Sequence, residues 1–345
     1  MARRRVVVLG LCVIALAAAP RFVGEGAQRF LSEALLMLAM AQMWNLLAGY
    51  GGLVSMGQQV FVGLGAYSFF VASMSLNVAP LWVLPVAPVV CALVAAVIAL
   101  FLFRLREAYF AIGMWVFSEI VSLIISKTEW LGSERGMGLS TARLMDARWL
   151  EPITFWLSVA VAVGAVAGTY LVMQSRVGLG LMTVRDNDLA AESIGVDVWR
   201  NRFIAFVISA AGCGIAGAVS FNATLYVAPA FAFDANWVVA MMFIVLMGGI
   251  GTLEGPIVGT IIYFALREVI TDVLNLSASW YLVALGAVAM ATMLFAPAGL
   301  WPIVRDRLGV EWLSVRRRPP AGWRPAPERD GPAVPAAQPR RARVE

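Results

Sequence analysis

The sequence predicts an all-α polytopic membrane protein with about ten transmembrane helices, some of them broken or re-entrant. Of its 345 residues, 61% are hydrophobic and only 14% are charged, and the mean hydropathy is +0.82. Soluble domains, by contrast, are roughly 45 to 50% apolar and about 25% charged. Apolar runs of membrane length repeat along the chain, and a polar island at 174–202 separates two of them.

Most of these runs are long enough to cross a hydrocarbon core about 30 Å thick, which takes about 20 residues of helix. The run at 237–247 is too short for a comfortable span, so the pair at 237–270 forms either two crossings or a re-entrant hairpin. In chain order, the ten runs lie at 5–23, 30–48, 57–76, 81–103, 109–126, 153–173, 203–227, 237–247, 256–270 and 280–297.

The first run also has features of a cleavable signal peptide, because arginines precede it and Ala17-Ala18-Ala19 offers a cleavage site. Pro20 directly after that site disfavours cleavage, so we expect the run to be retained as a helix. Residues 1–29 then form a basic start and a first helix, and residues 30–301 form the transmembrane domain. Residues 302–345 are rich in proline and arginine and are predicted to be a disordered tail.

Basic residues near both ends set the predicted orientation. Arginines at 3–5 precede the first span, and others follow the last, so the positive-inside rule places both termini in the cytoplasm. An even number of spans then puts the 174–202 island inside and the 127–152 loop outside. Each of these two loops has four basic and four acidic residues, so the orientation depends on this parity and not on their charge.

Composition also excludes several classes of function. The chain has no histidine, which removes the commonest metal ligand and general base. Cys12, Cys91 and Cys213 all lie inside apolar runs, where they are expected to be small buried side chains rather than metal ligands. No G-x-x-x-x-G-K-[ST] motif is present, so this chain is not expected to bind ATP. We expect contact with membrane lipid, no bound metal and no nucleic-acid partner.

Two glycine-rich breaks interrupt apolar runs at matching intervals. Paired breaks of this kind point to a solute path in transporters, because free backbone groups at membrane depth need protein or a water-filled cavity. Tight packing of helices through small residues is the alternative interpretation. The break glycines are Gly49, Gly51, Gly52 and Gly57 in the first stretch, and Gly248, Gly249, Gly251 and Gly255 in the second. Candidate path residues beside them are Asn45, Ser55, Gln58, Gln59 and Thr252.

Two acidic residues fall inside predicted spans. Charge at membrane depth is costly and is therefore a functional candidate by default. Glu33 lies near a predicted span end and can reach the interface. Glu119 lies midway through its run, so it must face protein or water, be paired, or be neutral. We count Glu119 among the candidate path residues, with a structural hydrogen bond as the alternative.

The polar island contains the pattern of a short helix. Asn187 or Asp188 can cap its start, alanines at 190 and 191 favour helix with little bulk, and Gly195 can end it in a left-handed conformation. Such a helix outside the membrane is suited to docking against a partner protein. A solvated loop helix is the alternative.

These motifs together resemble the permease subunits of branched-chain amino-acid ABC importers, the LivM-like group. The resemblance covers roughly 30–302, nearly all of the chain except its two ends. The residues that carry it are Asn45-Leu46-Leu47, Gly49-Tyr50, Gly52, Ser55, Gly57, Phe61, Gly63, Gly65-Ala66-Tyr67, Arg185-Asp186-Asn187-Asp188, Ala190-Ala191, Gly195, Ser209-Ala210, Ala216-Gly217, Gly248-Gly249, Gly251-Thr252 and Gly255-Pro256.

The resemblance implies a non-catalytic subunit of an importer in the bacterial inner membrane. Its partners would be a second, LivH-like permease, two ATP-binding subunits that carry ATP and Mg²⁺, and a periplasmic solute-binding protein. The island would supply a cytoplasmic coupling helix that sits on an ATPase, so that ATP binding drives alternating access. The residues assigned to coupling are Arg185, Asp186, Asp188, Ala190, Ala191, Glu192 and Gly195.

Some positions depart from the family pattern. The family often has histidine after the glycine at 57, where this chain has Gln58, and Trp130 and Leu131 stand where threonine and glycine are usual in an outer loop. A permease of the same architecture for urea or short amides is an alternative. An ion-coupled secondary transporter that uses Glu119 is another. The sequence does not identify the solute.

Overall fold

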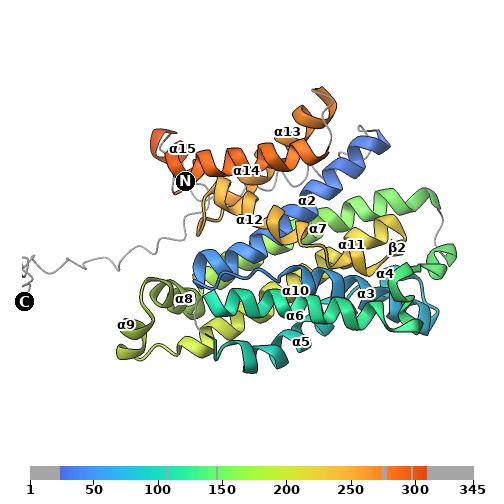
Figure 1. Cartoon of the computed structure of the whole chain (residues 1–345), viewed down its shortest axis with the longest axis horizontal. Coiled ribbons are helices and arrows are strands. Elements are labelled where there is room, and N and C mark those ends of the chain that lie inside the picture. The colour runs from blue at the N-terminus through green and yellow to red at the C-terminus, as the bar shows by residue number, and fades with distance from the viewer. Residues whose placement is uncertain (1–23, 106–107, 145–146, 274–277, 297, 309–345) are drawn as a thin grey trace, which may run out of the picture. The chain divides into compact units, whose positions relative to one another are not determined.

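The computed structural model describes residues 24–105, 108–144, 147–273, 278–296 and 298–308, and Figure 1 shows them as packed helices. Sheet within these residues is limited to two short strands, so the all-α prediction is confirmed. The strands are β1 (Met137–Gly138) and β2 (Tyr226–Val227). The long helices are α2 (Glu25–Asn45), α3 (Gln59–Leu76), α5 (Val86–Leu102), α6 (Ala108–Ser126), α7 (Ala147–Gln174), α10 (Val198–Thr224), α12 (Asn236–Gly248), α13 (Gly255–Glu268) and α14 (Ala278–Phe295).

Shorter helical elements connect or extend these helices. Two of them are π-helical turns, η2 at the end of α2 and η6 at the end of α13. The short elements are η2 (Leu46–Tyr50), α4 (Pro80–Val83), η3 (Glu129–Leu131), η4 (Ser133–Arg135), η5 (Ser140–Leu144), α8 (Arg176–Asp186), α9 (Asp188–Ser193), α11 (Pro229–Ala232), η6 (Val269–Val273) and α15 (Leu300–Leu308).

Seven segments of the described chain are long and apolar enough to cross a membrane, and they match seven of the predicted runs in order. Of the other three predictions, 5–23 lies outside the described residues, while 256–270 and 280–297 coincide with the shorter α13 and α14. The total of ten therefore stays a prediction. The seven segments are Gly26–Tyr50, Gln59–Leu76, Pro80–Leu102, Ala108–Ser126, Arg148–Gln174, Val198–Thr224 and Pro229–Gly248.

The two large polar loops lie at opposite ends of α7, a helix of 28 residues. At 1.5 Å per residue this helix is about 42 Å long, more than the thickness of a hydrocarbon core. At the N-terminal end of α7, the loop before it pairs through β1 with β2, which directly follows α10. At the other end, α7 leads into α8 and α9. The 127–152 loop and the polar island are therefore on opposite sides of the bundle, as the parity of spans predicts.

The pair of runs at 237–270 has room for two crossings. α11 and α12 together form a candidate span of 20 residues, Pro229–Gly248. α13 continues into η6, and the stretch 255–273 is about 28 Å long if it is treated as α-helix. The apolar run at 237–247 is too short to span a membrane because Asp234 interrupts the pattern before it. In the structure, helix begins earlier, at Pro229. These lengths favour two full crossings over a re-entrant hairpin.

α10 is the central helix of the bundle, packed against α2, α3, α5 and α7. Its glycines permit this close approach. A Cβ atom added to Gly214 would overlap the sulfur of Cys91 on α5, and one added to Gly217 would overlap the backbone of Val62 on α3. Gly214 and Gly217 therefore allow α10 to pack tightly against α5 and α3.

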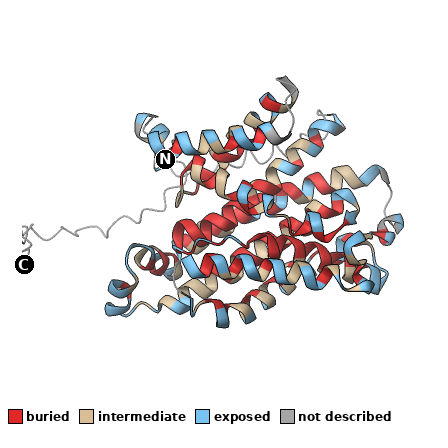
Figure 2. Cartoon of the chain, in the orientation of Figure 1, coloured by how far each residue is buried: buried red, intermediate tan, exposed pale blue. Residues whose placement is uncertain are grey.

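α5 has two distinct faces, and Figure 2 shows the exposed and buried residues of such helices. Small residues four apart in sequence form the buried face, which packs on α10 and α3. Large apolar residues form the outward face, as expected for a helix in contact with lipid acyl chains. The buried residues are Ala87, Cys91, Ala95 and Ala99, and the outward ones are Val89, Leu93, Val97, Leu100 and Phe101.

Candidate functional site

The first glycine-rich break is an irregular segment between α2 and α3. The π-helical turn η2 ends at Tyr50, and residues 51–58 have no regular helix before α3 begins at Gln59. The backbone carbonyl of Ser55 accepts a hydrogen bond from the indole of Trp44 at 2.9 Å. The predicted interruption is therefore present, and it is folded back against the end of α2 rather than extended.

Polar side chains of this break are buried in the bundle. Gln58 donates to the hydroxyl of Ser209 on α10 at 2.7 Å, and Ser209 donates to the carbonyl of Met43 at 2.8 Å. Within the described chain, Ser55 Oγ, Gln58 Oε1 and both polar atoms of Gln59 are buried without a hydrogen-bond partner. A buried polar group without a partner costs about 1–3 kcal/mol, so this cluster is suited to binding water or a polar solute when the bundle opens.

The C-terminal end of the break rests on α6. A Cβ atom added to Gly57 would overlap the carbonyl oxygen of Met114 and approach the amide of Trp115. Only glycine permits this contact between the two backbones. The break is thus packed directly on the middle of α6, which the sequence did not predict.

The second break, residues 249–254 between α12 and α13, is a compact turn. The hydroxyl of Thr252 donates to the carbonyl of Gly249 at 2.7 Å and accepts from the amide of Gly255 at 3.0 Å. Gly251 has φ +72°, a left-handed conformation that favours glycine. Gly248 packs against the backbone of Gly255, so the small residues here also bring α12 and α13 together.

Asn45 joins the two breaks, which are about two hundred residues apart in sequence. Its side-chain amide donates to the carbonyl of Thr252 at 2.8 Å, and its side-chain oxygen accepts from the amide of Gly251 at 2.8 Å. Asn45 is fully buried. Asn45 and Thr252 were predicted as path residues, and the structure places both in a contact that holds the two breaks together.

Arg185, at the end of α8, contacts both breaks at the same place. Its guanidinium donates to the carbonyl of Gly49 at 2.6 Å, and a Cβ atom added to Gly251 would overlap that same guanidinium nitrogen. We refer to Asn45, Gly49, Arg185, Gly251 and Thr252 as the junction. The polar island is therefore connected to both glycine-rich breaks through one side chain.

The predicted helix of the polar island is confirmed as α9. The side chain of Asn187 accepts from the amide of Ala190 at 3.0 Å and caps the first turn. Gly195 has φ +84°, and the amide of Val196 donates to the carbonyl of Ala191 at 3.0 Å, which closes the C-terminal end. These local bonds explain why six residues remain helical although isolated helices of this length are unstable.

The residues of α9 divide into those that face the chain and those that face outward. Asp188 binds the guanidinium of Arg202 on α10 with two hydrogen bonds, at 2.8 and 2.9 Å, and Ala191 is fully buried. Both were assigned to the docking surface from the sequence; Ala191 is closed off by the bundle, whereas Asp188 is partly exposed and is already paired within the chain. Leu189 is 78% exposed and Ile194 is 71% exposed, and these two apolar side chains are the outward surface that the sequence did not identify.

The remaining coupling candidates lie at the surface. Ala190 and Gly195 are exposed, as are Asp186 and Glu192. Within the described part of the chain, neither Asp186 nor Glu192 forms an ion pair. Both carboxylates are therefore free to pair with basic residues of another protein.

The two acidic residues of the predicted spans have different surroundings. Glu33 on α2 binds Arg267 on α13 through two hydrogen bonds, at 2.5 and 2.9 Å, and the guanidinium lies 4.9 Å from the ring centroid of Phe264. Glu119 is exposed on the outward side of α6. Glu33 therefore connects two helices, whereas Glu119 faces away from the described bundle.

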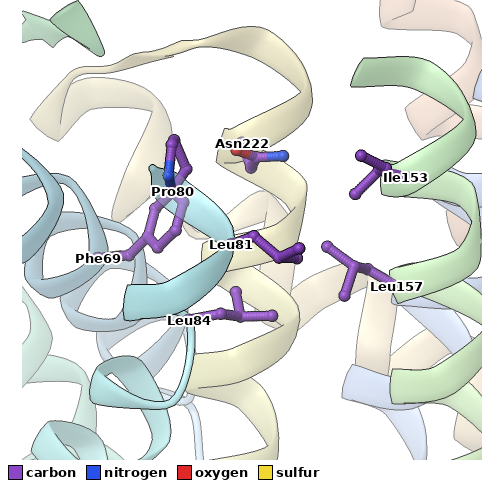
Figure 3. A pocket seen from close by; sticks show the side chains of 7 residues that line it. All are labelled: Phe69, Pro80, Leu81, Leu84, Ile153, Leu157 and Asn222. Carbon is purple, nitrogen blue, oxygen red and sulfur yellow. The ribbon is translucent and has the colours of Figure 1, made fainter. Parts of the chain in front are cut away.

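An apolar pocket lies elsewhere, lined by side chains from α3, α4, α7 and α10. In Figure 3 the side chains of Leu81 and Leu84 face those of Ile153 and Leu157 across it. None of the predicted path residues lines this pocket. Its lining side chains are Phe69, Pro80, Leu81, Leu84, Ile153, Leu157 and Asn222.

The bonds of Asn45 give a direct test of the junction. Asn45→Ala is expected to lower the stability of the protein, because the amide of Gly251 and the carbonyl of Thr252 each lose a partner. The cost is about 1–3 kcal/mol for each buried group left without a partner. Thermal unfolding of the purified protein in detergent measures the change.

The matched control is Asn236→Ala, which removes an exposed amide whose side-chain contacts are with Asp234, two residues away. We expect this variant to unfold at nearly the wild-type temperature. Equal unfolding temperatures for Asn45→Ala and the control would contradict the role given to Asn45.

Comparisons with known proteins agree with this architecture. The family described as branched-chain amino acid transport system / permease component matches residues 27–293. The high-affinity branched-chain amino acid transport system permease protein LivM of Salmonella typhimurium is 27% identical, with 89% of this chain and 77% of the relative covered. LivM of Escherichia coli is 26% identical over the same shares.

A probable branched-chain amino acid transport permease protein LivH of Methanocaldococcus jannaschii is 24% identical, over 47% of this chain and 50% of the relative. The chain is therefore similar to two kinds of permease. No solved structure matches it. Because the family match extends over most of the chain, from the start of α2 to the end of α14, this protein belongs to the family of branched-chain amino acid transport permeases.

Proposed function

We propose that this permease is the transmembrane subunit of an ATP-binding-cassette importer for branched-chain or related amino acids. In this proposal a periplasmic binding protein delivers the solute, a LivH-like permease completes the membrane domain, and two separate ATPase subunits bind ATP and Mg²⁺. The complex lies in the bacterial inner membrane, with both termini of this chain in the cytoplasm. The names of the relatives support the solute class and the pairing of two permeases.

The hydrogen bond from Arg185 to Gly49 is the observation that carries the proposal. It connects the island to the first break, and the bonds of Asn45 extend this connection to the second break. A displacement of α8 therefore moves both breaks together. An external motor acting on one short helix can change the conformation of the membrane domain through such a connection.

α9 is held in a way that suits transmission of movement. Asp188 binds Arg202, so α9 is connected to the central helix α10 as well as to the breaks. Leu189 and Ile194 project outward from the same segment. Exposed apolar side chains beside free carboxylates are typical of a protein interface with an apolar centre and a polar rim.

In the proposed cycle, ATP binding closes the partner ATPases, and α9 moves with them. The junction transmits this movement to the two breaks, and the helices around them open to receive the solute from the binding protein. The unpartnered polar atoms of Gln58 and Gln59 then become accessible to water and solute. ATP hydrolysis returns the bundle to the inward-facing state.

The docking surface is tested by Leu189→Arg. This change is expected to weaken the co-purification of the ATPase subunits and to lower ATP-driven uptake, because it replaces an apolar contact with a charge that must be desolvated. Replacing a hot-spot residue at the centre of an interface costs about 2 kcal/mol or more, roughly thirtyfold in affinity. Pull-down of the complex and uptake into proteoliposomes measure the two effects.

Leu189→Met keeps the apolar surface and serves as the control, with near wild-type values expected for both measurements. Unchanged co-purification and unchanged uptake in Leu189→Arg would contradict the docking assignment. Uptake by vesicles that lack ATP, if it were abolished by Glu119→Gln, would instead indicate an ion-coupled transporter.

A further inference from the structure

Among the candidate spans, α6 is the one that the described residues cover least, with 28% of its span buried. Its outward face exposes large side chains along the whole helix, including Ile112, Trp115, Val116, Ile120 and Leu123. Glu119 is exposed on this same face. It lies about 10 Å of helix from the C-terminal end at Ser126, so its carboxylate is well inside the span.

The outward face of α5 provides a comparison within the same molecule. Its exposed large side chains are all apolar, which suits contact with acyl chains. The α6 face differs from it by the carboxylate of Glu119. A charge at this depth is costly in contact with lipid and is found facing protein or a water-filled cavity. The α6 face is therefore expected to be covered by protein and water rather than by lipid.

Glu119 also differs from the other acidic residues of the candidate spans. Glu33 and Glu151 bind arginines, and Asp234 accepts hydrogen bonds from Asn236. Within the described residues, Glu119 is the only acidic residue of these spans without an ion pair or a hydrogen bond. Any partner of Glu119 therefore lies outside the described bundle.

The position of Glu119 is connected to the junction. Gly57 packs on the backbone of α6 at Met114 and Trp115, about one turn before Glu119. The same break carries Gly49, to which Arg185 is bonded. A movement of the coupling segment would therefore reach α6 about one turn from this carboxylate.

We propose that Glu119 binds the ammonium group of the amino-acid solute in a water-filled path along the α6 face, which the second permease subunit closes. This inference rests on the proposed function and adds a ligand for the solute to it. An amino acid carries an ammonium group, and a carboxylate is the side chain that best replaces water around a cation through charge-assisted hydrogen bonds. The LivM and LivH relatives support a pair of permeases, and a second permease is the partner to which this proposal assigns the α6 face.

The first test measures whether position 119 is accessible to water in the assembled transporter. Glu119→Cys is expected to react with the water-soluble cation 2-(trimethylammonium)ethyl methanethiosulfonate, and saturating solute is expected to slow that reaction. Leu93→Cys, exposed on the apolar face of α5, is the matched control and is expected to stay unlabelled. Wild-type protein measures the background from the native cysteines, of which Cys91 and Cys213 are buried. An unreactive thiol at position 119 would overturn the inference, as would equal labelling of the two variants.

The second test measures how amino-acid uptake depends on the negative charge of Glu119. Glu119→Gln is expected to lower the rate of amino-acid uptake roughly tenfold, the effect of losing one charge-assisted hydrogen bond. Assembly of the complex and ATP hydrolysis stimulated by the binding protein are expected to persist. Glu119→Cys is expected to regain uptake after treatment with 2-carboxyethyl methanethiosulfonate, which restores a carboxylate, and not after treatment with the cationic reagent. A residue with a purely structural role would not show this dependence on the sign of the charge.

Wild-type uptake in Glu119→Gln, or equal rescue by both reagents, would overturn the inference while leaving the proposed function intact. Failure of the proposed function has a different signature, because wild-type transporter would then show no ATP-driven uptake of amino acids at all.

Discussion

Arg185→Ala is expected to reduce ATP-driven uptake at least about tenfold, because it removes a hydrogen bond from a charged donor, which is worth about 1.5–3 kcal/mol. The guanidinium of Arg185 reaches the carbonyl of Gly49 at 2.6 Å and lies against Gly251. Without it, α8 keeps its helix but loses its hydrogen bond to the carbonyl of Gly49 and its contact with Gly251. ATP hydrolysis by the complex is expected to continue without transport, since the docking surface on α9 is unchanged.

Uptake and ATP hydrolysis are measured on the same proteoliposomes, and their ratio is the informative quantity. Arg176→Ala is the matched control, because Arg176 is an exposed arginine at the start of the same helix, and its replacement removes the same charge. We expect a wild-type ratio for the control. If both variants transport equally well, or if Arg185→Ala loses ATP hydrolysis in parallel with uptake, the junction does not couple the two processes.

Gly57→Ala is expected to lower both the amount of folded protein and its uptake, because the added methyl group would overlap the carbonyl of Met114. Backbone atoms cannot rotate away as a side chain can, so the break and α6 must separate. Overpacking of this kind costs about 1–3 kcal/mol. It also shifts the contact through which the first break meets α6. The expected result is a lower unfolding temperature in detergent and a loss of transport per folded molecule.

Gly164→Ala on α7 is the control, because a Cβ atom there meets no other atom within 4 Å. Alanine is also the better helix former, so this variant is expected to be as stable as wild type or slightly more stable. If Gly57→Ala unfolds and transports like Gly164→Ala, the close contact between the break and α6 is not a constraint on the protein.

Local patterns predicted much of the fold and part of the site. Apolar runs located the helices, because crossing a hydrocarbon core demands a length and composition that few other structures have. The cap residues Asn187 and Gly195 correctly predicted α9, because both act within a few residues of the backbone groups that they satisfy. The short helix α11 at 229–232 was missed, since Asp234 interrupts the apolar pattern just after it.

The orientation of side chains on α9 could not be predicted in the same way. Ala191 and Asp188 were placed in the docking surface for their size and charge, yet one is buried and the other binds Arg202. Which face of a six-residue helix is covered depends on where the helix rests against α10. No periodicity in so short a segment contains that information.

The sequence by itself determined that this is a helical membrane protein with two glycine-rich breaks, a capped helix in a polar island and an acidic residue deep in a span. These properties follow from composition, length and bonds between near neighbours in the chain. Only the tertiary structure decided that Asn45 and Arg185 join the breaks to the island, and that Glu119 faces outward while Glu33 is paired. Such contacts join residues tens to hundreds of positions apart, and they depend on how helices pack, which no local pattern encodes.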